Sequence, residues 1–291
     1  MGDLFLPIAD IVAAAGLDLR VTATNAGWET RSRSSGGFAA APLGVMWHHA
    51  ASARGADSEG IVNYQVRGNP DAPVGNMTLD RDGSVWPVAA GASNCSGKGG
   101  PWPMSRGTVP QDQGNTHLVN IETCNDGVGE PWPTAMIDGY MTLTNALNAW
   151  CGNAPDDVVS HNAYAPTRKI DPATADAVQG PWRPRASTSS GTWELYDIAV
   201  ELIDRAAGRP DPTPTPDPDP GDDDMPKIIY AFREYANTWS ETGVHLSAEA
   251  YNALVAQGAT VVVSELTWPK NQHLDSLMRI SGLTDEYLIP K

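Results

Sequence analysis

A segment rich in proline and aspartate divides this chain into two parts. Proline occupies every second position from residue 210 to residue 220, and six aspartates lie between or just after these prolines. Because proline cannot donate a backbone hydrogen bond and the aspartates repel one another, we expect an extended, solvated spacer here. The sequence therefore predicts a first domain at residues 1–208, a linker at residues 209–224 and a small second domain at residues 225–291.

The composition limits the classes of function that the chain can have. It has 291 residues, of which 41% are hydrophobic, and its net charge is −16. This hydrophobic fraction is sufficient for the cores of about two domains. The excess of negative charge argues against a nucleic-acid partner, which requires a basic surface. No run of eighteen apolar residues is present, so we expect no membrane span.

The N-terminal segment is typical of a helix rather than of a secretion signal. Met1–Pro7 is apolar but acidic, and it contains no basic residue and no clear cleavage site. Ile8, Ile11, Val12 and Ala15 recur at helical spacing. We therefore expect a short amphipathic helix, no signal peptide, and a protein that is held in the cytoplasm of the cell that makes it.

The rest of the first domain alternates between segments typical of strands and of helices. Residues 44–49 and 118–122 are short apolar runs of the kind found in buried strands, and residues 76–88 have a hairpin pattern with Asp-Gly in the turn. Apolar residues recur at helical spacing in residues 133–150 and 191–207. This alternation predicts an α/β fold.

Two histidine-containing segments predict a metal site. In one segment His161 and Asp171 lie ten positions apart, with Lys169 two residues before the aspartate. The other segment, far upstream, contains the adjacent His48 and His49. Two imidazoles and one carboxylate form a suitable ligand set for zinc, and three protein ligands leave the fourth tetrahedral position for water, as in catalytic zinc sites.

These two segments together resemble the zinc-dependent N-acetylmuramoyl-L-alanine amidases, and most closely the amidase-type endolysins of phages that infect actinobacteria. In that family an apolar strand ends in His-His-Thr-Ala, and residues 47–52 here read Trp-His-His-Ala-Ala-Ser. The family's second motif is His…Pro-Gly-Arg-Lys-x-Asp-Pro, and residues 161–172 match it except that Thr167 replaces the glycine. The resemblance covers residues 25–205. It implies a mixed central sheet flanked by helices, with zinc in a surface groove.

The resemblance assigns three metal ligands, His48, His161 and Asp171. Adjacent residues of a strand point to opposite faces, so only one of His48 and His49 can face the metal. The residues alone do not choose between these two, whereas the family's pattern selects the first. The replacement at Thr167 alters the loop between the ligands and not the ligands themselves.

The resemblance also implies two catalytic residues. Glu122 ends the segment Val-Asn-Ile-Glu where the family has Ile-Gly-Ile-Glu, and it would deprotonate water and protonate the leaving nitrogen. Asn120 replaces the glycine of that motif, and we expect it to narrow the approach to the site. Lys169 matches the family's lysine near the scissile carbonyl and would stabilise the oxyanion. The alternatives are a capping or salt-bridged glutamate and a solvated surface lysine.

Other conspicuous residues have structural interpretations. Asn94–Gly100 is rich in glycine but lacks the spacing of a phosphate-binding loop, so we expect a loop of the groove and no nucleotide site. The cysteines lack metal-pair spacing and are expected to be reduced thiols, with Cys124 on the same sheet face as Glu122. The cysteines are Cys95, Cys124 and Cys151, and the tryptophans that adjoin proline and are expected to pack in the interior are Trp102, Trp132 and Trp182.

The second domain is also predicted to be α/β. Strands are expected at residues 228–232 and 261–263, and helices at residues 248–257 and 274–280. We expect this domain to be a cell-wall-binding module that strengthens the binding of the whole chain to the wall by adding a second attachment point. Self-association is a further expected role.

The end of the linker suggests an internal translation start. The codons of Gly221–Asp224 must place GGN-GA shortly before the AUG of Met225, which resembles a bacterial ribosome-binding site. We hypothesise that free copies of the second domain are made from this start and assemble with the full chain. The alternative is an ordinary acidic linker.

The function that these features predict is hydrolysis of the amide between N-acetylmuramic acid and L-alanine in peptidoglycan. The expected enzyme is an endolysin that stays in the host cytoplasm until lysis and then acts on the cell wall. Two alternatives from other classes are a non-catalytic peptidoglycan-recognition module, which would have lost a ligand, and a virion-associated structural component. All three predicted ligands and the glutamate are present, which favours the enzyme.

Overall fold

The computed structural model describes residues 4–208, 228–232 and 260–264. The chain divides into two units, residues 1–214 and 215–291. In the second unit, β8 (Ile228–Phe232) and β9 (Thr260–Ser264) pair in parallel, which confirms the two predicted strands. The predicted linker, the helices predicted after residue 247 and the suggested start at Met225 lie outside the described residues, so the proposed domain limits remain predictions.

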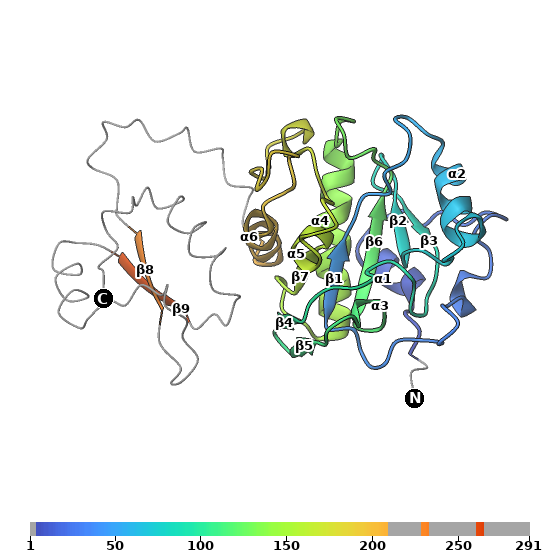
Figure 1. The fold of residues 1–291 in the computed structure, drawn as a ribbon, viewed down its shortest axis with the longest axis horizontal. Coiled ribbons are helices and arrows are strands. Elements are labelled where there is room, and N and C mark those ends of the chain that lie inside the picture. The colour runs from blue at the N-terminus through green and yellow to red at the C-terminus, as the bar shows by residue number, and fades with distance from the viewer. Residues whose placement is uncertain (1–3, 209–227, 233–259, 265–291) are drawn as a thin grey trace. The chain divides into compact units, whose positions relative to one another are not determined.

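A five-stranded mixed sheet forms the centre of the first unit, in the order β3-β2-β6-β1-β7 (Figure 1). The middle strand pairs are parallel, whereas β2 and β3 form the predicted antiparallel hairpin. This arrangement confirms the expected mixed α/β sheet. The strands are β1 (Gly44–Trp47), β2 (Met77–Leu79), β3 (Val85–Pro87), β6 (Leu118–Thr123) and β7 (Val158–Ser160), and a separate hairpin consists of β4 (Trp102–Met104) and β5 (Gly107–Val109).

Helix α4 (Thr134–Cys151) covers one face of this sheet and packs against β1 and β2. Helices α1 (Ile8–Ala14) and α6 (Leu195–Ala206) pack against α4 in turn, so all three predicted helices exist. The shorter helical elements are η1 (Trp28–Thr30), α2 (Ser58–Asn63), η2 (Tyr64–Gly68), α3 (Gly114–His117), α5 (His161–Tyr164) and η3 (Ala175–Ala177). No helix in the described part of the chain has the length and apolar character needed to cross a membrane.

The prediction of a helix from residue 191 was wrong over its first four residues. The backbone N–H of Trp193 donates to the carbonyl of Pro172, and this residue pairs with Ala186 in an isolated bridge. The buried Trp193 ring packs edge-on against Trp132 and Trp182. Trp193 therefore belongs to a tryptophan cluster beside α6 and not to the apolar stripe of the helix. The three tryptophans that were predicted to pack in the interior, Trp102, Trp132 and Trp182, are all buried.

The alternation of side chains along the strands decides which residues face away from α4. Trp47 stacks on Tyr140 of α4 with ring centroids 3.7 Å apart, so the next residue, His48, points to the opposite face. In the sheet register Met46 lies beside Asn120 of β6. Met46 and His48 both alternate with Trp47, so Asn120 lies on the side of the sheet opposite α4. Because alternate residues share a face, Glu122 lies on that side as well.

A glycine in the β2–β3 turn provides a test of this packing. Gly83 has φ of 84°, and a Cβ there would lie 2.6 Å from the carbonyl oxygen of Ala135 at the start of α4. Gly83→Ala should therefore combine the strain of a left-handed alanine, about 1–2 kcal/mol, with a steric clash of about 1–3 kcal/mol. Gly16→Ala is the matched control, because φ is 69° and no atom lies within 4 Å of the position that the new Cβ would take. Thermal unfolding should show the larger loss for Gly83→Ala, and equal losses would contradict the close contact with α4.

Candidate active site

The predicted site residues meet at the carboxyl ends of three neighbouring parallel strands. His48 directly follows β1, Glu122 is the next-to-last residue of β6, and His161 directly follows β7 as the first residue of α5. Ligands of open α/β sheets bind at this edge. The Ser160 hydroxyl caps α5 by accepting from the backbone N–H of Ala163, which fixes the chain where His161 leaves the strand.

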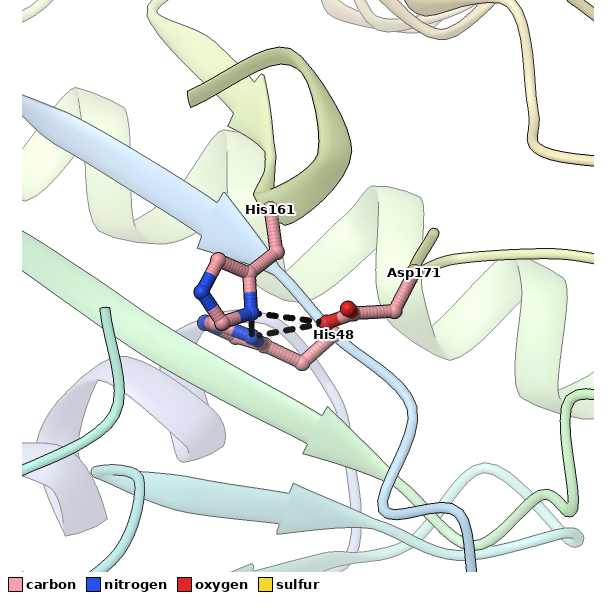
Figure 2. A group of neighbouring side chains, drawn as sticks. All are labelled: His48, His161 and Asp171. Carbon is pink, nitrogen blue, oxygen red and sulfur yellow. Dashed lines mark hydrogen bonds and ion pairs between the residues drawn. The ribbon is translucent and has the colours of Figure 1, made fainter. Parts of the chain in front are cut away.

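Three of these side chains form a compact group of nitrogen and oxygen atoms (Figure 2). The Nδ1 atoms of His48 and His161 lie 2.9 Å apart. Asp171 Oδ2 lies 3.1 Å from Nδ1 of His48 and 2.9 Å from Nδ1 of His161. All three residues are buried. The structure thus brings together the three residues that were predicted to bind a metal.

Burial and mutual contacts shift the pKa values of this group in different directions. Burial and then the neighbouring His48 lower the pKa of His161 to about 4. Burial also acts to lower the pKa of His48, but the Glu122 carboxylate and the contact with Asp171 outweigh it and raise this pKa. Burial would raise the pKa of Asp171, yet the close contacts with both histidines hold it well below its usual range. The carboxylate of Asp171 is therefore ionised and His161 is neutral near pH 7.

The second histidine of the upstream pair is not part of this group. The His49 side chain is buried, and its ring packs near Trp132 and so close to Gly127 that a Cβ there would lie 2.1 Å from Cε1. Its Nδ1 atom has no hydrogen-bond partner. His48 therefore occupies the position toward Asp171 that the sequence left open between the two, and His49 is a packed neighbour.

A second layer of polar groups lies behind the two histidines. Nε2 of His48 is 3.0 Å from Oδ1 of Asn120, and Nε2 of His161 is 3.0 Å from the carbonyl oxygen of Ser96. The Ser96 hydroxyl donates to the same Asn120 oxygen over 2.7 Å. The expectation that Asn120 narrows the approach to the site was wrong, because this fully buried side chain turns behind His48 and does not line the groove.

Glu122 is a buried carboxyl group with one free oxygen. The Cys95 thiol donates to Oε1 over 3.0 Å, whereas Oε2 has no hydrogen-bond partner. Burial raises the pKa of Glu122. Cys124, which was predicted to lie on the same sheet face as Glu122, has a buried thiol whose neighbours include Ser58 of α2 and Asp80.

The site opens into a groove. A cavity of about 590 Å³ is lined by all three members of the histidine–aspartate group and by Glu122 and Lys169. A second cavity of about 600 Å³ adjoins it along α2 and η2, and Glu122 lines both. A ligand bound across this groove would therefore pass Glu122.

The loop of residues 94–100 forms one wall of this groove, as predicted. Arg168 donates to the carbonyl oxygens of Ser96 and Lys98 over 2.7 and 2.6 Å. Asn94 and Cys95 line the cavity itself. The segment that carries His161 and Asp171 is thus tied by an arginine to the loop that faces it.

Two groups among the described residues could hold a metal ion, and both contain His48. The first is His48, His161 and Asp171; the second is His48, Cys95 and Glu122, with ligand atoms within 4.8 Å of one another. The second group would use Nε2 of His48, which already faces the Asn120 amide oxygen. A neutral imidazole has one lone pair and one N–H, so it cannot serve both groups at once. The contact with Asn120 favours the first group.

The comparison with protein families agrees with this geometry. Residues 39–174 match the family described as N-acetylmuramoyl-L-alanine amidase. This part of the chain is similar to that amidase family. The matched span contains the five predicted site residues, which are His48, Glu122, His161, Lys169 and Asp171.

Solved structures similar to the amidase domain have low sequence identity. AmiD from E. coli, in complex with the substrate anhydro-N-acetylmuramic acid-L-Ala-D-gamma-Glu-L-Lys, is 18% identical with a TM-score of 0.37, and the match covers 50% of this chain and 57% of AmiD. An AmpD derivative is 16% identical with a TM-score of 0.40, covering 56% and 84% of the two chains. A mutant endolysin from Bacillus subtilis is 22% identical with a TM-score of 0.34, covering 51% and 82%. The comparison with curated proteins found no match.

The amidase site contains residues that the sequence did not predict to take part. The Cys95 thiol donates to the carboxylate of Glu122. The carbonyl oxygen of Ser96 contacts His161, and the Ser96 hydroxyl donates to the Asn120 oxygen behind His48. The Tyr140 hydroxyl accepts from the backbone N–H of His48 over 2.7 Å. The glycine-rich loop gave a general signal for the first two residues, since it was predicted to border the groove. Tyr140 had no signal besides its place in the apolar stripe of α4.

Proposed function

We propose that the first unit hydrolyses the amide between N-acetylmuramic acid and L-alanine in peptidoglycan with the help of a zinc ion. The observation that carries this proposal is the buried group of two imidazoles and one carboxylate beside a buried glutamate with a free oxygen, inside a span that matches the amidase family. The ligand set and the glutamate are complete, which supports an enzyme over a non-catalytic recognition module.

The donor atoms fit a zinc ion. Nitrogen from histidine and oxygen from aspartate are both common zinc ligands, and ligand atoms around a tetrahedral zinc lie about 3.3 Å apart. The three atoms of His48, His161 and Asp171 lie 2.9 to 3.1 Å apart. A zinc ion held by these residues would supply Lewis-acid chemistry by activating water for attack and polarising the scissile carbonyl.

The chain's own residues would carry out the proton transfers. Oε2 of Glu122 is free to accept a proton from the attacking water, because the Cys95 thiol occupies only the other oxygen. The same carboxyl group would then donate this proton to the leaving alanine nitrogen. Lys169 lines the cavity and would offer its positive charge to the carbonyl oxygen as negative charge develops there.

The first test of this proposal is removal of one ligand. His161→Ala should lose bound zinc and activity together, because only two donors would remain. Elemental analysis of the purified chain should find about one zinc per unaltered molecule and much less in the variant. His117→Ala, at a half-buried histidine of α3 outside the group, is the control and should keep both properties. A fully active protein without metal would contradict the proposal.

The second test separates the base from the metal. Glu122→Gln preserves the shape of the side chain but cannot accept the proton, so turnover should fall on the order of a hundredfold or more while zinc is retained. The assay should weigh the products released from purified peptidoglycan, where a free stem-peptide amine and intact glycan are expected. Glu59→Gln, on α2, is the control and should leave turnover near normal. Near-normal turnover of Glu122→Gln would mean that another group acts as the base.

We further propose that the chain acts as an endolysin. In this role it stays in the host cytoplasm until lysis, and its second unit then attaches it to the cell wall. The likeness of residues 47–52 and 161–172 to the motifs of amidase-type endolysins supports this proposal, and so does the proline–aspartate spacer between two units. Self-association through the second unit is a further part of the proposal.

Truncation tests the contribution of the second unit. A chain that ends at Arg209 should still cleave soluble muropeptides, because every proposed catalytic residue precedes this position. It should bind intact cell walls more weakly than the full chain, since it lacks the second attachment point. Sedimentation with purified walls measures this difference. Equal binding by the two chains would point to a docking or assembly role for the second unit.

A further inference from the structure

Each of the two histidines of the proposed metal site has a hydrogen-bond acceptor behind it. Nε2 of His161 lies 3.0 Å from the carbonyl oxygen of Ser96, which can only accept, so this nitrogen must carry the hydrogen. The Arg168 guanidinium lies 3.4 Å from the same nitrogen, but its Nη2 lies closer to the carbonyl oxygens of Ser96 and Lys98, at 2.7 and 2.6 Å. Those two carbonyls use both hydrogens of Nη2, so none is left for His161.

The same argument applies to His48. The Asn120 Nδ2 atom donates to the carbonyl oxygen of Leu118 over 3.1 Å, so the other end of this amide must be the oxygen. That oxygen accepts from the Ser96 hydroxyl over 2.7 Å and lies 3.0 Å from Nε2 of His48. Nε2 of His48 therefore also carries a hydrogen, which leaves the Nδ1 lone pair of the neutral ring toward Asp171.

We propose that Asn120 and Ser96 are positioning residues that hold both imidazoles with Nε2 protonated and so direct both Nδ1 lone pairs to the metal. The inference rests on the proposed metal site. Ser96 connects the two histidines, because its carbonyl oxygen accepts from His161 and its hydroxyl donates to the oxygen that accepts from His48. The amide oxygen comes from a side chain that the Ile-Gly-Ile-Glu motif lacks.

The surroundings hold both positioning residues in place. Asn120 and Ser96 are fully buried. The Asn115 side-chain oxygen accepts from the backbone N–H groups of Cys95 and Ser96 over 2.9 and 2.8 Å, which fixes the loop. The backbone N–H of Asn120 donates to Oδ1 of Asn76 over 2.9 Å. Neither acceptor can therefore turn away from its histidine without breaking further buried hydrogen bonds.

Zinc affinity measured by competition with a chelator tests this inference. Outer hydrogen-bond partners of metal-binding histidines change metal affinity by about 10- to 100-fold when removed, and we expect a loss in this range for Asn120→Ala. Asn120→Asp keeps an oxygen acceptor and should recover part of the affinity. Ser96→Ala keeps the carbonyl acceptor of His161 and loses only the hydroxyl, so its loss should be smaller than that of Asn120→Ala.

The matched control is Asn148→Ala. Asn148 is an equally buried asparagine of α4 that donates to the carbonyls of Pro155 and Asp157, away from the histidines. It should lower thermal stability without changing zinc affinity. An equal loss of affinity in Asn148→Ala and Asn120→Ala would overturn the inference, and so would unchanged affinity in Asn120→Ala.

Nuclear magnetic resonance of the unaltered, zinc-loaded protein provides a test that does not depend on any variant folding. Long-range proton–nitrogen spectra of the imidazoles should show His48 and His161 with hydrogen on Nε2. A hydrogen on Nδ1 of either ring would overturn the inference while leaving the amidase proposal intact. An unaltered chain that binds no zinc would overturn the proposed metal site and this inference with it.

Discussion

The stacking of Trp47 on Tyr140 fixes the direction of the residue on which the site is built. Trp47 is fully buried, its ring lies against Tyr140 of α4, and its indole N–H donates to the Thr144 hydroxyl over 2.8 Å. Because side chains alternate along a strand, this arrangement turns His48 to the other face of the sheet. The Tyr140 hydroxyl also accepts from the His48 backbone N–H, so one helix residue holds both the strand and its end. The geometry of a polar site thus depends on apolar packing on the opposite face.

Burial makes the polar groups of the site depend on one another. An unpaired buried charge is costly, so the Asp171 carboxylate and the two imidazole nitrogens that it contacts form a group that a bound cation would stabilise. The histidines in turn require acceptors for their outer nitrogens, which Asn120 and Ser96 provide. Glu122 differs from these groups, because its Oε2 atom has no partner. An unsatisfied buried oxygen beside an otherwise satisfied group is the feature expected of a residue whose partner is the reactant.

Local patterns in the sequence predict the elements and the metal ligands but not the contacts between distant segments. The hairpin, the apolar stripe of α4 and the spacing of the ligand motif are all local features. Trp193 lies near a helical stripe, and only its contacts with Trp132 and Trp182 show that it packs beside α6 rather than within it. Asn120 and Ser96 lie 24 residues apart, so no spacing connects them. The sequence also does not show which way the Asn120 side chain turns, and its motif alone therefore indicates an obstacle in the groove instead of a partner for a histidine.

The net charge of the chain acts at long range, whereas the side chains that line the groove act on a bound substrate. A net charge of −16 disfavours anionic cell-wall polymers at long range. Charges on a protein surface are screened over about 8 Å at physiological ionic strength, however, so the groups nearest a bound substrate dominate its binding. In the groove, Arg168 and Lys169 adjoin the metal-binding group, and Arg168 contacts neutral carbonyls rather than a carboxylate. The groove therefore offers two positive side chains to a carbonyl oxygen that gains negative charge, beside the carboxyl groups of Asp71, Glu122, Asp126 and Asp171.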